Sequence, residues 1–506
     1  MSPSRRTRAV VAVYLGTFMA TLAISIVTVA LPAIQAGLHI DFAGLQWVVG
    51  SYALCLSACM LSTGPLGDRY GRKRAWLAGV GLFVLGSAVS ALATSLAVLI
   101  VGCAVQGIAG ALVIPGALSI LTQAFPDPAA RSHVIGGWSS FSGVSLILGP
   151  MIGGVLVDHL GWPSIFLVNL PVGLLALGLG LAGIDESADP DHAALDPAGQ
   201  ILSIALLGSL TYGLIGAGRN GWAAADVLAA FGIALASAIL FIAVERRVER
   251  PVLPVDLFRD RGFALVNLAS FVLGFCGYSS LFLFSLFLQQ AQGWSASEAG
   301  GRMAPVFAAM AIVAAQFGRL AKRYGQTRLM VTGYLLLGIS MLAMTVFSPD
   351  TAYWMIAPAF TLLGIGMGLA VPATGAAAMQ AAPRQRTGAA SATMNALRQS
   401  GMTIGIALLG AVMVAGASGD MALRLAAAGM DDALALADSA VRSHALPEGL
   451  VMDPAAFKAL LEAGFAHGFA LAAGIAGLCG VAMALALAMM PRTGTAGPAA
   501  AAPDEN

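Results

Sequence analysis

Fourteen long apolar runs occupy most of the chain, and each is long enough to cross a lipid bilayer. A helix needs about 20 mainly apolar residues to span the hydrocarbon core. Backbone N–H and C=O groups must be paired inside lipid, so runs of this kind are expected to be helical. The runs lie at residues 9–32, 44–65, 75–94, 97–123, 132–157, 163–184, 198–217, 224–244, 263–288, 299–318, 328–347, 352–377, 387–416 and 462–490. The sequence therefore predicts an all-α polytopic membrane protein.

The composition supports a membrane protein and excludes several other classes. Charged residues make up 10% of the chain and apolar residues 58%, whereas a soluble domain carries roughly 25% charge. The formal net charge of +1 disfavours a nucleic-acid partner, which would require a basic face. The five cysteines show no metal-ligand or disulfide spacing. We expect no nucleic-acid partner, no metal and no cofactor.

The positions of the basic residues predict the orientation of the spans. The first run follows Arg5, Arg6 and Arg8 and is longer than the apolar region of a signal peptide, so we interpret it as a retained span. An even number of spans places both termini on one side. With that side inside, twenty of the 26 Lys and Arg residues lie in inner segments and four in outer segments. The positive-inside rule therefore predicts cytoplasmic termini.

An internal repeat predicts how the spans are grouped. Residues 64–74 and 318–328 share Gly, Leu, Arg, Tyr, Gly and Arg at the same spacing, each time after a span. A turn that only sets topology would explain the charges but not the matched Gly, Leu and Tyr. Spans 1–6 then correspond to spans 9–14, with spans 7 and 8 inserted between two six-helix halves. The predicted units are residues 1–184, the inserted pair 185–262, the second half 263–490 with an outer loop at 417–461, and a disordered cytoplasmic tail at 491–506. We expect short amphipathic helices within the outer loop.

Several motifs in order carry a family resemblance. Besides residues 64–74, they are Gly143 to Gly154 in span 5, Trp162 to Gly173 at span 6, Pro251 to Phe258 before span 9 and Gly388 to Gly401 in span 13. Together they resemble the major facilitator superfamily, specifically its fourteen-span drug:proton antiporter branch. The resemblance implies a multi-pass transporter of the bacterial inner membrane, whose partners are a small-molecule substrate, protons and the lipid bilayer. It also implies alternating access and a monomer.

The resemblance assigns a gating role to the loop after span 2. Asp68 is its only acid, among four basic residues. It can pair locally or sit at a helix N-terminus of the opposite half. Arg69 and Asp127 form a candidate partner pair, and a plain surface ion-pair cluster is the alternative. The candidate gating residues are Gly64, Gly67, Asp68, Arg69, Gly71, Arg72 and Asp127.

The span 5 segment resembles the antiporter motif of the branch. Its glycines permit close helix packing, and its proline removes a backbone donor and bends the helix. A structural role in close helix packing and a functional role in a flexible interface between the halves lead to the same physical expectation for this segment. The motif residues are Gly143, Gly149, Pro150, Gly153 and Gly154.

The chain departs from the branch at two charged positions. Ala23 stands where span 1 usually has Asp, and Cys103 stands where span 4 usually has Arg. When both charged side chains are absent, neither is left without its partner in the low-dielectric interior. None of the 25 acids lies near a span midpoint, although such an acid is the usual proton carrier or cation partner. Export of a neutral or anionic amphiphile, such as an antibiotic or metabolite, is therefore favoured.

Arg398 is the main intramembrane charge. It lies about 18 Å into span 13 at 1.5 Å per residue, where a charge is costly and often functional. It can offer a positive charge to substrate, or be a structural Arg satisfied by carbonyls. For Arg302 we expect a local pair with Glu298. The substrate-cavity candidates are Thr21, Ser25, Thr28, Tyr52, Gln106, Ser142, Asn267, Tyr278, Asn395 and Arg398.

Three other functions remain as alternatives. A cationic multidrug exporter could couple through a peripheral acid such as Asp41 or Glu298. A non-transporting sensor or scaffold would also lack the usual coupling charges. A membrane-embedded enzyme would need a nucleophile, base or metal cluster at depth, and the spans hold no Asp/Glu pair and no His pair. We therefore expect no enzymatic activity.

Overall fold

The computed structural model describes residues 3–188, 196–248, 253, 255–383, 386–447 and 452–489. Within these ranges the protein contains helices and no strands, and fourteen helices are long and apolar enough to cross a membrane. The predicted all-α class and the number of spans are thereby confirmed. The predicted tail 491–506 lies outside the described residues.

The helices follow the predicted order of spans. The first six spans are α1 (Pro3–Leu38), α2 (Phe42–Tyr70), α3 (Arg72–Ala91), α4 (Leu96–Ala124), α5 (Pro128–Leu160), and α6 (Ser164–Leu167) together with α7 (Asn169–Gly183). The inserted pair is α8 (Pro197–Asn220) and α9 (Ala225–Glu245), followed by the short η1 (Val255–Arg259). The last six spans comprise α10 (Arg261–Leu273), η2 (Gly274–Tyr278), α11 (Ser280–Leu286), η3 (Phe287–Ala291), α12 (Ala296–Tyr324), α13 (Gln326–Ala343), η4 (Met344–Val346), α14 (Tyr353–Gln380), α15 (Thr387–Ala427) and α17 (Pro454–Ala488), with the short α16 (Ala433–Ser443) before α17.

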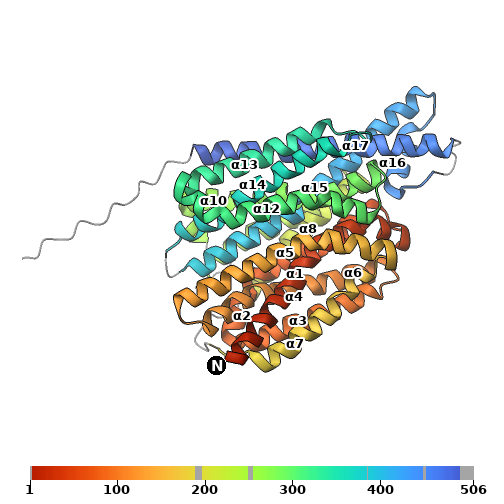
Figure 1. Ribbon diagram of the computed structural model, residues 1–506. Helices are drawn as coiled ribbons and strands as arrows, with labels where there is room; N and C mark the ends of the chain where they lie inside the picture. The colour runs from red at the N-terminus through yellow and green to blue at the C-terminus, as the bar shows by residue number, and fades with distance from the viewer. Residues whose placement is uncertain are drawn as a thin grey trace, which may run out of the picture.

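The helices gather into two bundles. Helices α1–α7, the N-terminal bundle, run from red to yellow in the lower part of Figure 1, and helices α10–α17, the C-terminal bundle, run from green to blue above them. The same packing recurs in both: α2 and α3 pack on α4, and α12 and α13 pack on α14. The bundles meet where α5 contacts α12 and where α2 contacts α15. Helix α8 packs on α9, α2 and α15, so the inserted pair lies beside the second junction.

The repeated motif forms equivalent turns in the two bundles. Gly71 separates α2 from α3 with φ = 112°, and Gly325 separates α12 from α13 with φ = 85°. Both values lie where side chains other than hydrogen are strained. This requirement gives a physical reason for the matched glycines.

Aspartates begin many of the helices. A carboxylate that accepts from a first-turn N–H satisfies one of the donors a helix leaves unpaired. The Asp N-caps are Asp41, Asp127, Asp196, Asp260 and Asp453. Five of the chain's 25 acidic residues therefore cap the first turns of helices at span ends.

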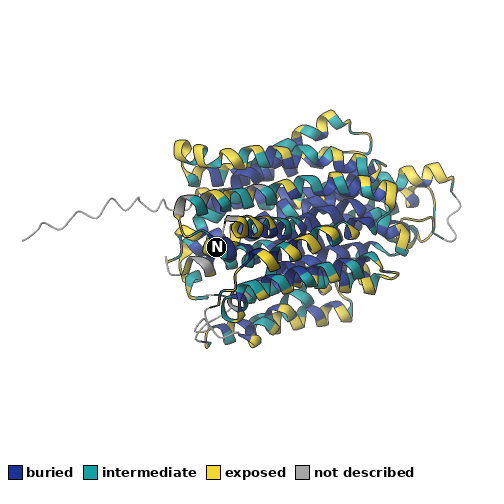
Figure 2. Ribbon diagram, turned by 60° about the horizontal axis from the view of Figure 1, so that its bottom comes forward, coloured by how far each residue is buried: buried dark blue, intermediate teal, exposed yellow. Residues whose placement is uncertain are grey.

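Burial distinguishes a central span from the periphery. In the span Arg261–Ala291, 83% of an 18-residue apolar stretch is buried. In the inserted span Ala225–Glu245, 28% of the corresponding stretch is buried. Figure 2 shows the same contrast, with dark blue segments inside and yellow ones around them. The central span was predicted as one helix at 263–288, but one π-helical turn, η2, interrupts it and a second, η3, ends it. Such turns often occur at functional sites.

The outer segment 417–461 is more helical than predicted. Helix α15 continues to Ala427 because its apolar face stays covered, with Ala417, Met421 and Leu425 buried. The expected amphipathic helix is present as α16, which buries Ala437 and Val441. The last span begins at Pro454, earlier than expected, where Asp453 caps it.

Candidate functional site

Two ends of the bundle must be distinguished. The inner end is where α1 begins and where α2 meets α3, and the sequence predicts it to be cytoplasmic. The outer end is where α1 ends and where α12 begins at Ala296.

The loop predicted to gate the inner end, residues 64–74, is held within the N-terminal bundle. Arg72 Nε lies 2.6 Å from the Asp68 carboxylate, and both side chains are half-buried. The Arg69 guanidinium lies 5.6 Å from the centre of the Tyr70 ring. Gly67 is buried within α2, whereas the surroundings of Gly64 fall outside the described residues. Asp68 thus has a local partner in this conformation.

An acidic segment that sequence reasoning passed over completes this loop. The Glu186 carboxylate accepts hydrogen bonds from the backbone N–H groups of Lys73 (3.1 Å) and Arg74 (3.2 Å), the first turn of α3. A Cβ at Gly71 would lie 2.7 Å from Glu186 Oε1. Asp185 pairs with Arg5 at 2.7 Å. The available signal was the inner loop 185–197, which is acidic and has no Lys or Arg.

Asp127 has a structural role in this conformation. Its carboxylate accepts from Ala130 N–H at 2.8 Å and caps α5. No ion pair between Arg69 and Asp127 occurs among the described residues. The pairing of these two residues stays a prediction for another conformation.

The span 5 motif contacts both bundles. A Cβ at Gly149 would meet Ser25, and one at Gly153 would meet Ile26, so these glycines set the approach of α5 to α1. A Cβ at Gly154 would meet the carbonyl oxygen of Ala296 at the start of α12. Close approach of the bundles therefore depends on Gly154.

The same crossing has a glycine on its other side. A Cβ at Gly300 of α12 would meet the carbonyl oxygen of Pro150. A Cβ at Gly143, by contrast, would meet nothing within 4 Å. The five motif residues therefore differ in the packing they impose.

Hydrogen bonds between the bundles lie at the outer end and at mid-depth. They join Thr28 to Ser285, Val29 to Gln289, Gln35 to Gln290 and Arg442, Gln46 to Ile406 and Ala407, Ser57 to Ala396 and Ser400, and Asp158 to Ser297. In the described ranges, no hydrogen bond or ion pair joins the two bundles at the inner end. The conformation is therefore closed on the outer side.

Arg398 forms a cluster with two other predicted residues. Its Nη2 donates to Asn395 Oδ1 at 2.5 Å, one turn earlier on α15. Its guanidinium carbon lies 5.5 Å from the centre of the Tyr278 ring in η2. All three side chains are half-buried. Among the described residues, Arg398 has no carboxylate partner, so its positive charge is not neutralised by an acid.

Most of the other cavity candidates form hydrogen bonds with nearby groups, although the Oδ1 of Asn267 is buried without a partner. Tyr52 donates to Ala20 O (2.8 Å), Gln106 to Ser87 Oγ (2.7 Å) and Asn267 to Phe263 O (2.8 Å). The hydroxyls of Ser25, Thr28 and Ser142 donate to carbonyls of their own helices. Thr21 bonds to Thr17 O and to Ser145. Of these, Thr21 and Ser142 are half-buried and the rest are buried.

The two neutral positions, Ala23 and Cys103, line one cavity in the N-terminal bundle. Tyr52, Gln106 and Asn169 line the same cavity. It has about 10 Å³ of space for the centre of a water molecule, roughly enough for one water. Asn169 was not predicted as a site residue, and its Oδ1 is buried without a hydrogen-bond partner. The span 6 motif containing it was the available signal.

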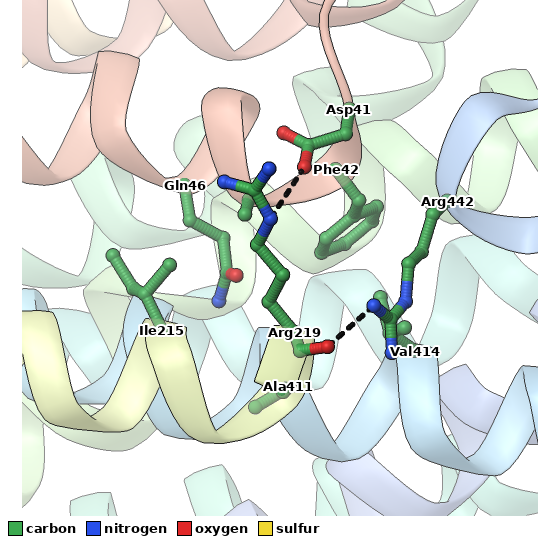
Figure 3. A pocket seen from close by; sticks show the side chains of 10 residues that line it. Asp41, Phe42, Gln46, Ile215, Arg219, Ala411, Val414 and Arg442 are labelled. Carbon is green, nitrogen blue, oxygen red and sulfur yellow. Dashed lines mark hydrogen bonds and ion pairs between the residues drawn. The ribbon is translucent and has the colours of Figure 1, made fainter. Parts of the chain in front are cut away.

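A second small cavity lies at the outer end beside the inserted pair (Figure 3). Arg219 at the end of α8 lies 3.5 Å from the Asp41 carboxylate. Arg442 of α16 donates to the backbone carbonyl of Arg219 at 2.5 Å. Gln46 lines the cavity as well. These contacts connect the inserted pair to both bundles, and sequence reasoning did not single out either arginine.

The expected pair between Glu298 and Arg302 is wrong. Glu298 accepts from Ser295 N–H in a capping box at the start of α12. The Arg302 guanidinium instead stacks over the Trp294 ring at 3.4 Å and lies 5.1 Å from the Tyr353 ring. The Glu298 carboxylate does not pair with Arg302 because it caps α12. The Arg302 guanidinium is stabilised by the aromatic ring faces instead.

Comparisons with known proteins identify the family. The Major Facilitator Superfamily profile matches residues 13–406. The multidrug resistance protein Stp of Mycobacterium tuberculosis (strain CDC 1551 / Oshkosh) is 38% identical over 405 residues, 80% of this chain and 75% of Stp. The methylenomycin A resistance protein of Bacillus subtilis (strain 168) is 35% identical over 79% of this chain and 86% of its own length. The tetracenomycin C resistance and export protein of Streptomyces glaucescens is 32% identical over 98% of this chain and 93% of its own.

Solved structures agree on the fold. A bacterial homologue of the human lysosomal transporter Spinster, in an inward-facing and unoccupied conformation, has a TM-score of 0.63 and 20% identity, covering 96% of this chain and 97% of that one. The human organic anion transporter MFSD10 has a TM-score of 0.61 and 14% identity, covering 96% and 100%. The chain belongs to the Major Facilitator Superfamily, in the branch that contains these multidrug and antibiotic resistance proteins.

Proposed function

We propose that the protein is a secondary active exporter of a small amphiphilic drug, antibiotic or metabolite in the bacterial inner membrane. The resistance and export functions named for its relatives support this proposal. Two repeated bundles fit a transporter that alternates between inward-open and outward-open states. The outer-side contacts fit the state that accepts cargo from the inside. Proton antiport is the energy source we propose.

The cargo we propose is neutral or anionic. The observation that carries this proposal is the half-buried Arg398, which has no acidic partner among the described residues. A cation approaching Arg398 would be repelled, whereas a carboxylate or enolate would form a charge-assisted hydrogen bond. Asn395 and Tyr278 would then orient the guanidinium while it holds the cargo.

The cationic alternative has less support. It required coupling through a peripheral acid, with Asp41 and Glu298 as examples. Asp41 caps α2 and pairs with Arg219, and Glu298 belongs to a capping box. Both carboxylates therefore have structural partners at helix ends. A cationic exporter would have to break one of these caps in each cycle.

We also propose that residues 64–74 gate the inner end. In this conformation Asp68 is paired with Arg72, and no hydrogen bond or ion pair between described residues joins the bundles at the inner end. In the outward-open state the same carboxylate is available to the C-terminal bundle. The Arg69–Asp127 pair would form in that state as well.

Transport by inside-out membrane vesicles tests the proposed cargo and coupling. We expect uptake of carboxyfluorescein but not of ethidium, and loss of uptake when nigericin collapses the pH gradient. Arg398→Gln should lower kcat/KM for the anion about tenfold, the loss of about one charge-assisted hydrogen bond. Arg424→Gln is the control, because Arg424 is exposed and pairs within its own helix.

Each alternative function predicts a different result in the vesicle assay. Ethidium uptake without carboxyfluorescein uptake would favour the cationic exporter. Unchanged uptake in nigericin would contradict proton antiport but not export. Failure to move any of a panel of neutral, anionic and cationic compounds would favour a sensor or scaffold.

A further inference from the structure

An acidic side chain at the outer end reaches from one bundle to the other. Asp158 lies in the last turn of α5, and its Oδ2 accepts a hydrogen bond from the backbone N–H of Ser297 at 3.0 Å. Ser297 is in the first turn of α12, in the C-terminal bundle. The contact thus joins the C-terminal end of one span to the N-terminal end of another.

The position at a helix N-terminus makes this contact favourable. The first N–H groups of a helix have no partners within it, and the helix dipole attracts negative charge to that end. Ser295 and Glu298 satisfy other groups of this turn through their capping box. The Ser297 N–H instead donates to an acceptor from the opposite bundle, the Asp158 carboxylate.

The surrounding packing makes the contact sensitive to rocking of the bundles. Gly154, one turn before Asp158, lies against the Ala296 carbonyl, and Gly300 lies against the Pro150 carbonyl. Backbones in direct contact cannot separate without moving Asp158 away from Ser297. The hydrogen bond therefore forms and breaks together with closure of the outer end.

Asp158 differs from the other side chains that bond across the junction. Among the described residues, the remaining side chains in these hydrogen bonds are Ser and Gln, which are uncharged. Asp158 is also exposed at its end of the bundle. It is the charged contact of the outer closure.

We propose that Asp158 is an outer latch, whose carboxylate on the first turn of α12 stabilises the outward-closed state. This inference rests on the alternating access of the proposed function. When the transporter opens outward, Asp158 separates from Ser297 and is solvated. The latch thereby sets the population of the two states without touching the cargo.

Spin-label distances in the full-length protein test the latch. One pair, Leu92→Cys with Val346→Cys, reports the outer end on two exposed sites in different bundles. A second pair, Gln123→Cys with Arg328→Cys, reports the inner end. Both are made in a background whose five native cysteines are replaced by serine or alanine. No cargo is added, so the readout is independent of transport.

Asp158→Ala should lengthen the outer distance and shorten the inner one. The expected shift in the ratio of the two states is about twofold to fivefold, as for a charge at a helix end. Asp158→Asn keeps an acceptor oxygen without the charge and should give a smaller shift. Asp226→Ala is the matched control, because this exposed acid at the outer end of α9 bonds to Asn220 of the inserted pair.

A double variant separates the latch from a general effect of losing an acid. Ser297→Pro removes the N–H donor in the first turn of α12, where proline is tolerated. In that background Asp158→Ala should shift both distances by less than it does alone, because the N–H from which Asp158 accepts is gone. Equal distances in wild type and Asp158→Ala, or an equal shift in Asp226→Ala, would overturn the latch. Either result would leave the export proposal to be decided by the vesicle assay.

Discussion

The guanidinium carbon of Arg398 lies 5.5 Å from the centre of the Tyr278 ring, and this contact joins α15 to the π-helical turn η2. The π turn places an aromatic ring beside the intramembrane charge. A ring face stabilises a cation without neutralising it. Arg398 is thereby positioned while it keeps its capacity for an anionic ligand.

The first prediction concerns this ring. Tyr278→Leu should raise the KM for an anionic cargo about threefold to tenfold, because a cation–π contact contributes about 0.5–2 kcal/mol. Tyr278→Phe keeps the ring and should change KM by less than about twofold. Initial rates in vesicles measure both. Equal losses in the two variants would show that the hydroxyl matters and the ring does not.

The second prediction compares two glycines of span 5 that differ in how closely other atoms approach them. Gly154→Ala places a methyl group against the Ala296 carbonyl and should disfavour outer closure by about 1–3 kcal/mol, the usual cost of overpacking. The outer spin-label pair should report a longer distance. Gly143→Ala is the matched control, since it has open space around it and should leave the distance unchanged. A shift in both variants would contradict the assigned difference.

Sequence reasoning predicted what depends on local composition. The spans follow from apolar runs, since lipid permits few other backbone structures. The turn at Gly71 and its counterpart at Gly325 could be predicted together because both motifs carry the same glycine. Even the cluster of Asn395 with Arg398 follows from i, i+3 spacing on a helix.

Contacts between distant segments could not be predicted in this way. Glu186 caps α3 only because the chain returns past the inner end after α7. Asp158 is one of the acids that the sequence places away from span midpoints, but its partner Ser297 depends on how the two bundles pack. For Arg302 the prediction from spacing was wrong. The i, i+4 spacing indicated a pair with Glu298, whereas in the folded protein Arg302 stacks on the Trp294 ring.

The third prediction tests the inner turn. Gly71→Ala should destabilise the protein by about 1–3 kcal/mol, the range for a residue held in a rare backbone conformation. The cause is twofold, since φ is 112° and a Cβ would approach Glu186. Gly81→Ala is the control: a Cβ at this α3 glycine would meet nothing within 4 Å, and alanine favours helix. Thermal unfolding in detergent should show a lower Tm for the first variant alone.

The fourth prediction concerns the cavity lined by Ala23 and Cys103. Either Ala23→Asp or Cys103→Arg alone places an uncompensated charge where there is space for about one water. Each should destabilise the protein by about 3–5 kcal/mol, as when a buried pair loses one partner. The double variant should recover much of this loss, because the two positions face one cavity. Thermal unfolding of the four forms gives the coupling energy directly.

The double variant also tests the proposed cargo. A paired carboxylate in the N-terminal bundle offers a partner to cations, so ethidium uptake should rise relative to carboxyfluorescein uptake. Cys103→Ser, which changes the side chain without adding charge, should leave the preference as it was. If the double variant is stable but its preference is unchanged, the absence of these charges does not set cargo charge. Arg398 would then have to account for the preference alone, and Arg398→Gln in the same background would measure its share.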